Sequence, residues 1–204
     1  MKPNSEIREL LAELLRALGQ AKLIASDLYR SSAEACLNAE ARGSLMLISQ
    51  SKMAQAARVS ALVGASPVLL VAEANPPPHD DWSSALMLAF ALDQAATGAL
   101  HGLADCRDAR ISTLARAIVE EERAHQTAVL GWLATAAGDS NSGARLARQM
   151  VAARDWIRAI FPRHTILARL AGSEFVSPDA AKRHDSFLAS LGDRIQEALG
   201  VLGD

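Results

Sequence analysis

Long stretches of this sequence repeat apolar residues at intervals of three and four positions, which is the spacing of one face of an α-helix. The first such run extends from residue 7 to residue 28, and Ser31 and Ser32 after it offer a turn. Its apolar residues are Ile7, Leu11, Leu14, Leu18, Ala21, Ala25 and Leu28. Only 4% of the residues are aromatic, whereas alanine and leucine, both strong helix formers, are abundant. We therefore expect an all-α protein.

The same spacing predicts further helices along the chain, with a stiff connection in the middle. The expected helices are residues 5–30, 33–63, 80–103, 109–136, 144–160 and 179–201. Pro76, Pro77 and Pro78 forbid helix and impose an extended path between the second and third helices. Two antiparallel hairpins joined by such a crossover form the layout of a ferritin-like four-helix bundle. We expect a single domain over residues 1–204, with a core bundle at about 5–137 and one or two C-terminal helices at about 144–202.

Net charge, hydropathy and cysteine content limit the binding partners and the cellular compartment that we expect. The net charge of −2 gives no general attraction to nucleic acid or to a membrane surface. The longest apolar run, residues 85–92, ends at Asp93, well short of the roughly 20 residues that a membrane span needs. The first residues contain no apolar segment of the kind found in signal peptides. Cys36 and Cys106 form no disulfide or metal-binding pattern, so we expect a cytoplasmic protein.

Three ionisable residues lie inside the apolar stripes of the third and fourth predicted helices. Asp93 interrupts the first of these stripes, and Glu122 and His125 interrupt the second. Asp93 and Glu122 are equally far from the turn near residue 107, so an antiparallel hairpin places them side by side. Burying an unpaired carboxylate costs several kcal/mol or shifts its pKa, so we expect a compensating cation. Glu121 borders the same face and is the alternative to Glu122.

The Glu-x-x-His spacing, with a carboxylate from the neighbouring helix, corresponds to half of a di-iron or di-manganese site. Asp93, Glu122 and His125 are therefore predicted to be metal ligands or the remnant of a metal site. The alternative is a buried acid–histidine network without metal. A complete site also needs ligands from the first two helices. The second helix instead carries Lys52 and Gln55 at the same spacing, and the core stripe of the first contains no carboxylate.

Lys52 has two interpretations that lead to different expectations. A protonated lysine is a poor metal ligand, but its ammonium group can neutralise Asp93 and Glu122 in place of a metal. Alternatively, its long side chain extends to solvent. We expect no bound cofactor; the alternative is Fe or Mn at a partial site.

Several short segments, spread across most of the chain, carry a resemblance to a known family. They are MAQAAR at 53–58, DWSSAL at 81–86, DARISTLA at 108–115, EEERAH at 120–125 and IFP at 160–162. On these segments the chain resembles the ferritin-like subunits of the bacterial multicomponent phenylacetyl-CoA epoxidase. The likeness is closest to the structural subunit, which binds no iron.

This resemblance implies a ferritin-like fold and a homodimer or hetero-oligomer with a related ferritin-like subunit. It also implies a role in positioning or stabilising a catalytic partner in phenylacetate-type aromatic catabolism, with an acyl-CoA as a candidate ligand. Lys52 and Gln55 would then mark a subunit that has lost its metal. The alternative is an enzyme, a non-haem iron or di-iron oxygenase acting on an acyl-CoA or another small substrate. A third reading is a helical adaptor in which the buried polar residues are only a network.

Overall fold

The computed structural model describes most of the chain, and the described part is entirely helical. It describes residues 5–64, 75–79, 81–138, 140–160, 163–171, 173 and 175–198. Within these ranges there are seven α-helices and no β-strand, which confirms the all-α prediction. The helices are α1 (Ser5–Ala35), α2 (Ala39–Ala61), α3 (Trp82–Leu103), α4 (Ala109–Ala136), α5 (Ser140–Ile160), α6 (Arg163–Ala171) and α7 (Ala180–Ala198).

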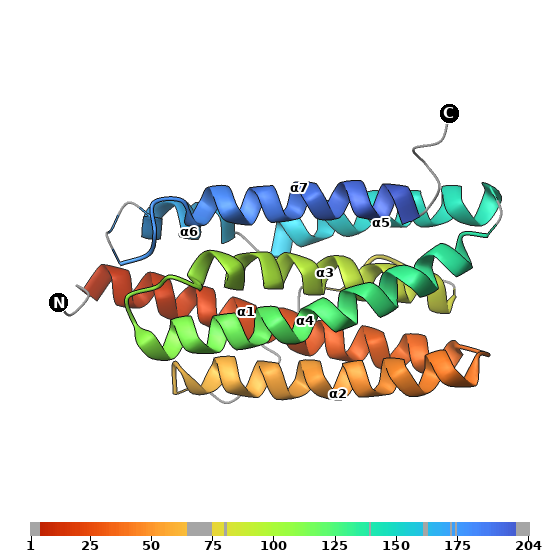
Figure 1. Ribbon diagram of the computed structural model, residues 1–204, viewed down its shortest axis with the longest axis horizontal. Coiled ribbons are helices and arrows are strands. Elements are labelled where there is room, and N and C mark those ends of the chain that lie inside the picture. The colour runs from red at the N-terminus through yellow and green to blue at the C-terminus, as the bar shows by residue number, and fades with distance from the viewer. Residues whose placement is uncertain are drawn as a thin grey trace.

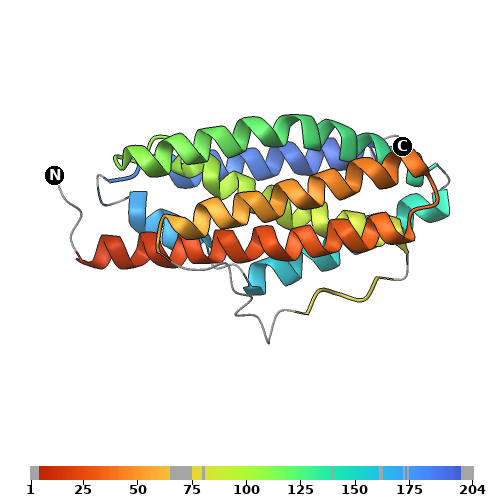
Figure 2. The same cartoon turned by 90° about the horizontal axis from the view of Figure 1, so that it is seen from below.

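The first four helices form two antiparallel hairpins that pack side by side (Figure 1). Helix α1 contacts α2 and α3, and α4 contacts the same two helices from the other side. Helices α2 and α3 run in the same direction, so the end of α2 and the start of α3 lie at opposite ends of the bundle (Figure 2). The part of the connection between them at residues 75–79, which includes the three consecutive prolines, is neither helix nor strand. Residues 65–74 lie outside the described residues.

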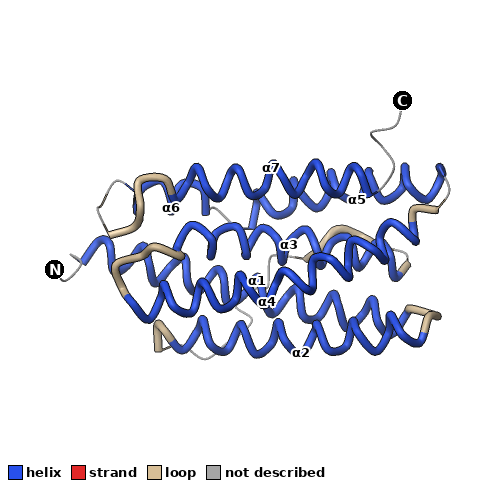
Figure 3. Tube along the Cα trace, viewed as in Figure 1, coloured by secondary structure: helices blue, strands red, loops and turns tan. Residues whose placement is uncertain are grey.

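Helix α3 is the centre of the molecule. It is contacted by α1 and α4 on one side and by α5 and α7 on the other, so that nearly every residue in it is buried (Figure 3). A helix surrounded in this way must be apolar all round, and the run at residues 85–92 meets that requirement. No helix in the described part of the chain is both long and apolar enough to cross a bilayer.

Small residues bring α1 and α2 close together. The hydroxyl of Ser26 donates to the carbonyl oxygen of Ser49 at 2.8 Å, and the Ser49 hydroxyl donates to the carbonyl oxygen of Ser26 at 2.9 Å. A Cβ atom added to Gly19 would lie only 2.7 Å from Oγ of Ser60. The close approach of these helices lets side chains from both reach the middle of the bundle.

The turn between α1 and α2 differs from the prediction. Helix α1 continues through Ser31 and Ser32 to Ala35, so the turn expected at these serines was wrong. The Ser32 hydroxyl donates to the backbone carbonyl of Trp82 at 2.7 Å and is thereby satisfied inside the helix. The cap of α2 is Asn38, whose side chain accepts a hydrogen bond from the Ala41 amide.

The starts of α3 and α4 are both capped by aspartate side chains. The Asp81 side chain accepts from the amide of Ser84, and the Asp108 side chain accepts from the amide of Arg110. Both aspartates satisfy backbone donors that have no partner within the helix. These caps define the residue at which each helix begins.

The C-terminal part contains three helices rather than the expected one or two. Helix α5 begins at Ser140, earlier than predicted, and the short helix α6 was not predicted at all. Pro162 was interpreted only as the end of a helix; it lies outside the described residues, and α6 begins at Arg163.

Candidate functional site: a buried tetrad of two lysines and two carboxylates

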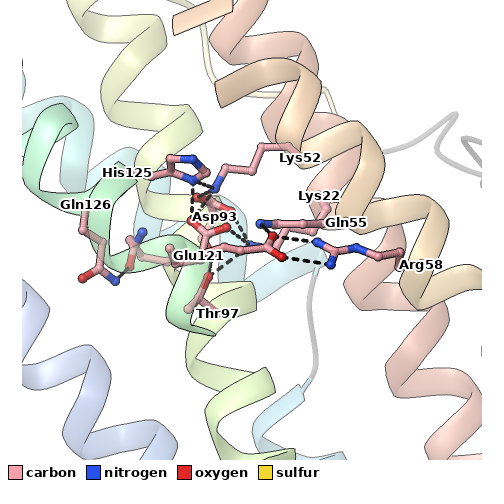
Figure 4. Close-up of polar contacts among 11 residues, drawn as sticks. Lys22, Lys52, Gln55, Arg58, Asp93, Thr97, Glu121, His125 and Gln126 are labelled. Atoms are coloured by element: carbon pink, nitrogen blue, oxygen red, sulfur yellow. Dashed lines mark hydrogen bonds and ion pairs between the residues drawn. The ribbon is translucent and has the colours of Figure 1, made fainter. Parts of the chain in front are cut away.

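The centre of the bundle holds four charged side chains, one from each of the first four helices. They are Lys22 of α1, Lys52 of α2, Asp93 of α3 and Glu122 of α4. All four side chains are completely buried. We refer to these four residues as the buried tetrad, whose surroundings are drawn in Figure 4.

Each lysine of the tetrad touches both carboxylates. Nζ of Lys22 lies 2.5 Å from Oδ1 of Asp93 and 3.3 Å from Oε1 of Glu122. Nζ of Lys52 lies 2.7 Å from Oδ2 of Asp93 and also donates to Oε2 of Glu122. The four formal charges cancel. This closed arrangement offsets much of the cost of taking the charges out of water, which an isolated pair with poor geometry does not.

Neighbouring side chains bind the remaining donors of the tetrad. Lys22 donates to the Thr97 hydroxyl at 3.1 Å, and that hydroxyl donates to the backbone carbonyl of Asp93 at 2.9 Å. Nζ of Lys52 lies 3.1 Å from Nδ1 of His125, which accepts this hydrogen bond when the imidazole is neutral. His125 is 21% exposed and so lies between the tetrad and solvent.

Tyr29 of α1 lies against the same cluster. Its side chain is fully buried, and Nζ of Lys52 is 5.8 Å from the centre of its ring. Burial raises the pKa of this phenol well above its usual value, and the negative charges of Asp93 and Glu122 raise it further.

The two carboxyl groups respond differently to the same surroundings. Burial by itself raises the pKa of Glu122, but the charges of Lys22 and Lys52 outweigh it and hold this pKa well below its ordinary value. For Asp93, burial and the charge of Glu122 outweigh the two lysines, so the pKa is raised. Glu122 is therefore the carboxylate that holds its negative charge more firmly.

The ammonium of Lys22 is stabilised by the same contacts. Burial alone lowers its pKa, but the carboxylates of Asp93 and Glu122 outweigh that effect and raise the pKa above its ordinary value. The tetrad thus favours a positively charged Lys22 in the middle of the protein.

The four residues meet because each hairpin turns at the right place. Lys22 lies as many residues before the turn between α1 and α2 as Lys52 lies after it. Asp93 and Glu122 lie at roughly corresponding places about the turn between α3 and α4, 10 residues before the end of α3 and 13 residues after the start of α4. In an antiparallel helix pair, residues at corresponding places on either side of the turn lie at the same height along the bundle. Because the two hairpins pack side by side, the two lysines meet the two carboxylates at that height.

The structure separates the predicted site residues into two groups. Asp93 and Glu122 meet at the centre with Lys52, and His125 lies at their edge. Lys52 does not extend to solvent, so that alternative was wrong. Gln55 is buried but does not join the tetrad, because its amide donates to the Glu121 carboxylate at 3.1 Å.

The choice between Glu121 and Glu122 is decided by the helix neighbouring α4. Glu121 turns toward α2 and accepts two hydrogen bonds from Arg58, at 2.9 and 2.6 Å. The charge of Arg58 and these hydrogen bonds lower the pKa of Glu121 despite its partial burial. Glu122 is the residue that points into the bundle.

Lys22 is the site residue that the sequence reasoning missed. A search for carboxylates on the first helix passed over a lysine that lies in the apolar stripe, between Leu18 and Ala25. The symmetry argument that paired Asp93 with Glu122 pairs Lys22 with Lys52 only about the observed turn near residue 37. About the turn expected at Ser31 and Ser32 it does not pair them, so the wrong turn hid this signal.

The donor set does not fit a di-metal centre. An ammonium group and a divalent cation cannot occupy the same position between two carboxylates, and here both lysines contact both carboxylates. Among the described residues, no group of three or more histidine, cysteine, aspartate or glutamate side chains is arranged to hold a metal ion. The chemistry that this arrangement supports is charge compensation.

No protein-family model and no curated protein matches the chain. Membership of the ferritin-like subunits of phenylacetyl-CoA epoxidase therefore stays a prediction from the sequence.

Proposed function

We propose that this chain is a ferritin-like structural subunit in which two lysines take the place of a di-metal centre. Ferritin-like di-metal proteins supply a carboxylate from each of two helices and a Glu-x-x-His pair from each of the other two. Here α3 carries Asp93 and α4 carries Glu122 and His125, whereas α1 carries Lys22 and α2 carries Lys52 and Gln55. The observation that supports the proposal is the contact of both lysines with both carboxylates.

The tetrad gives such a subunit a stable bundle that needs no metal. A metal site that lost ligands in one hairpin would leave carboxylates buried without compensation, at a cost of several kcal/mol. The ammonium groups of Lys22 and Lys52 supply that compensation. By the resemblance to the epoxidase subunits, the function of this stable bundle is to position or stabilise a catalytic partner in phenylacetate-type aromatic catabolism.

The test is metal analysis of the purified protein after growth in iron- and manganese-rich medium. We expect no stoichiometric metal in the wild-type protein. The matched control is the triple variant Lys22→Glu/Lys52→Glu/Gln55→His, which restores carboxylate and imidazole donors at the positions of α1 and α2. We expect this variant to bind Mn²⁺ or Fe²⁺ and to gain thermal stability when the metal is added. Stoichiometric metal in the wild type that Asp93→Ala removes would overturn the proposal.

The second candidate is a non-haem iron or di-iron oxygenase acting on an acyl-CoA or another small substrate. It is favoured by the placement of His125, which lies one helical turn from Glu122 with its Nδ1 atom 3.5 Å from Oε2 of that glutamate. This candidate requires Lys52 to leave its contacts with Glu122 and His125. It predicts bound metal together with oxygen-dependent turnover, and the same metal analysis separates the two candidates.

A further inference from the structure

The contact between Lys52 and Asp93 places an amine nitrogen beside a carboxyl carbon. Nζ of Lys52 lies 2.7 Å from Oδ2 of Asp93, and both side chains are completely buried (Figure 4). Because Oδ2 is bonded to Cγ, the nitrogen also lies within roughly 4 Å of that carbon. A neutral amine and a protonated carboxyl group can form an amide bond with loss of water. The bundle holds the two groups together, which removes most of the entropic cost of their encounter.

Burial favours the uncharged forms that this reaction needs. Moving one proton from the ammonium of Lys52 to the carboxylate of Asp93 turns the ion pair into a neutral amine and a neutral acid. An interior without water disfavours charged groups, so this transfer costs less here than at the surface. An amide between the two residues carries no charge, and it leaves Lys22 and Glu122 as a balanced pair at 3.3 Å. The core then buries two charges in place of four.

The other two residues of the tetrad lie where such a reaction needs them. Glu122 accepts a hydrogen bond from Nζ of Lys52, so its carboxylate can take the second proton that this nitrogen must lose. Nζ of Lys22 lies 2.5 Å from Oδ1 of Asp93, where its charge stabilises the negative charge that develops on this oxygen during the attack. Lys22 also donates to Oε1 of Glu122 at 3.3 Å, which keeps the two carboxyl groups next to each other.

Lys52 rather than Lys22 is suited to be the nucleophile. Nζ of Lys22 donates to three oxygen atoms, one of them the Thr97 hydroxyl. All three N–H bonds of this ammonium are therefore used, and freeing a lone pair on it costs one of them. Nζ of Lys52 donates to Glu122 and contacts Nδ1 of His125 at 3.1 Å, so it lies between two groups that can accept its protons.

We propose that Nζ of Lys52 and Cγ of Asp93 become joined by an isopeptide bond, an amide between the two side chains that links α2 to α3. After one proton has moved from Nζ to Oδ2, the nitrogen attacks Cγ, and the N–C bond forms as a second proton passes to Glu122. Glu122 gives this proton to Oδ2, the Cγ–Oδ2 bond breaks, and Oδ2 leaves as water. Nothing is oxidised or reduced. The inference rests on the geometry of the tetrad and not on the proposed role as a subunit.

The first experiment measures the intact mass of the purified full chain under denaturing conditions. We expect the wild type to be lighter than its sequence by one water. Lys52→Arg should have the full mass of its sequence, because a guanidinium keeps the charge but cannot be deprotonated. The matched control Lys182→Arg makes the same change at an exposed lysine of α7 and should still lose one water. A metal-free wild type with its full sequence mass overturns this inference and leaves the proposed function standing.

The second experiment locates the bond by digesting the denatured protein with trypsin and analysing the peptides by mass spectrometry. We expect residues 43–58, uncut at Lys52, to be joined to residues 59–107, which contain Asp93. In Glu122→Gln the yield of joined peptides should fall at least about tenfold, because the amide cannot carry the proton. An undiminished yield in that variant would contradict the proposed proton transfer.

Two further results of the digestion would overturn the assignment of the bond. One is a joined peptide that contains Lys22, uncut, in place of Lys52. The other is a wild type that has lost one water but yields no joined peptides, since an aspartate that cyclises onto its own backbone loses the same mass.

Discussion

The two hairpins of the bundle carry opposite charges at equivalent positions. The α1–α2 hairpin contributes Lys22 and Lys52, whereas the α3–α4 hairpin contributes Asp93 and Glu122. Neither pair is stable alone in a buried position, because each would place two like charges a few ångströms apart in a medium of low polarity. The comparison teaches that each half of this core is compatible with the fold only because the other half is present.

The two hairpins also differ in what surrounds the charges. In the acidic hairpin, Asp93 lies on a helix covered on all sides, and Thr97 binds Lys22 beside it. In the basic hairpin, Lys52 lies on a helix that packs against α1 and α4 with one face and leaves Leu47 and Met53 exposed. Helix α2 therefore takes part in the core with one face only.

The largest effect is expected from removing one charge of the tetrad. Lys52→Met should lower the free energy of unfolding by about 3–5 kcal/mol, because it leaves Asp93 and Glu122 buried with one cation between them. Urea unfolding measures the change. The matched control is Lys182→Met, which alters an exposed lysine of α7 and should change stability by less than about 0.5 kcal/mol.

A double variant shows whether charge balance is the cause. Lys52→Met/Glu122→Gln removes one cation and one anion, leaving the balanced contact between Lys22 and Asp93. We expect it to be more stable than Lys52→Met alone, by about 1–3 kcal/mol of coupling. If the second change only adds to the loss, the two residues are not compensating each other.

A smaller effect is expected from acid. The folded-state pKa of Glu122 is depressed below its unfolded value, near 4.5, so its contribution to stability is present above that pH. This contribution is lost as the pH falls through the folded-state pKa. The raised pKa of Asp93 acts in the opposite direction, since protonation of that group favours the folded state.

Unfolding free energies measured from pH 7 to pH 3 should therefore decline below about pH 4.5, near the unfolded-state value for Glu122. In Glu122→Gln the same curve should be flatter over this range, because the group that takes up the proton on unfolding is absent. An equally steep curve for the variant would assign the acid sensitivity to other carboxylates.

The smallest effect is expected at Gln55, the residue of the α1–α2 hairpin that stays outside the tetrad. Gln55→Leu removes one hydrogen bond to Glu121, which keeps both of its bonds from Arg58. It also removes the Gln55 Oε1 atom, which is buried and has no partner among the described residues. We expect a change within about 1 kcal/mol in thermal or urea unfolding. A loss as large as that of Lys52→Met would place Gln55 in the tetrad's network after all.

The sequence alone determined the all-α class, the two hairpins of the first four helices and the placement of Asp93 and Glu122 at one level. Helical spacing defines where α3 and α4 lie, and similar distance from a turn defines which residues face each other. The same reasoning failed at Ser31 and Ser32, because a serine hydroxyl satisfied by a neighbouring helix does not end its own. Sequence patterns contain no record of such a neighbour.

Which residues form the site is shown only by the tertiary structure. Lys22 was missed because lysine is rarely buried, and its burial here depends on two carboxylates from helices far along the chain. Likewise, Glu121 and Glu122 border the same face, and only the position of Arg58 on α2 shows which one turns outward. A helix repeat defines a face, whereas the charge that a face can bury is defined by what the other helices place against it.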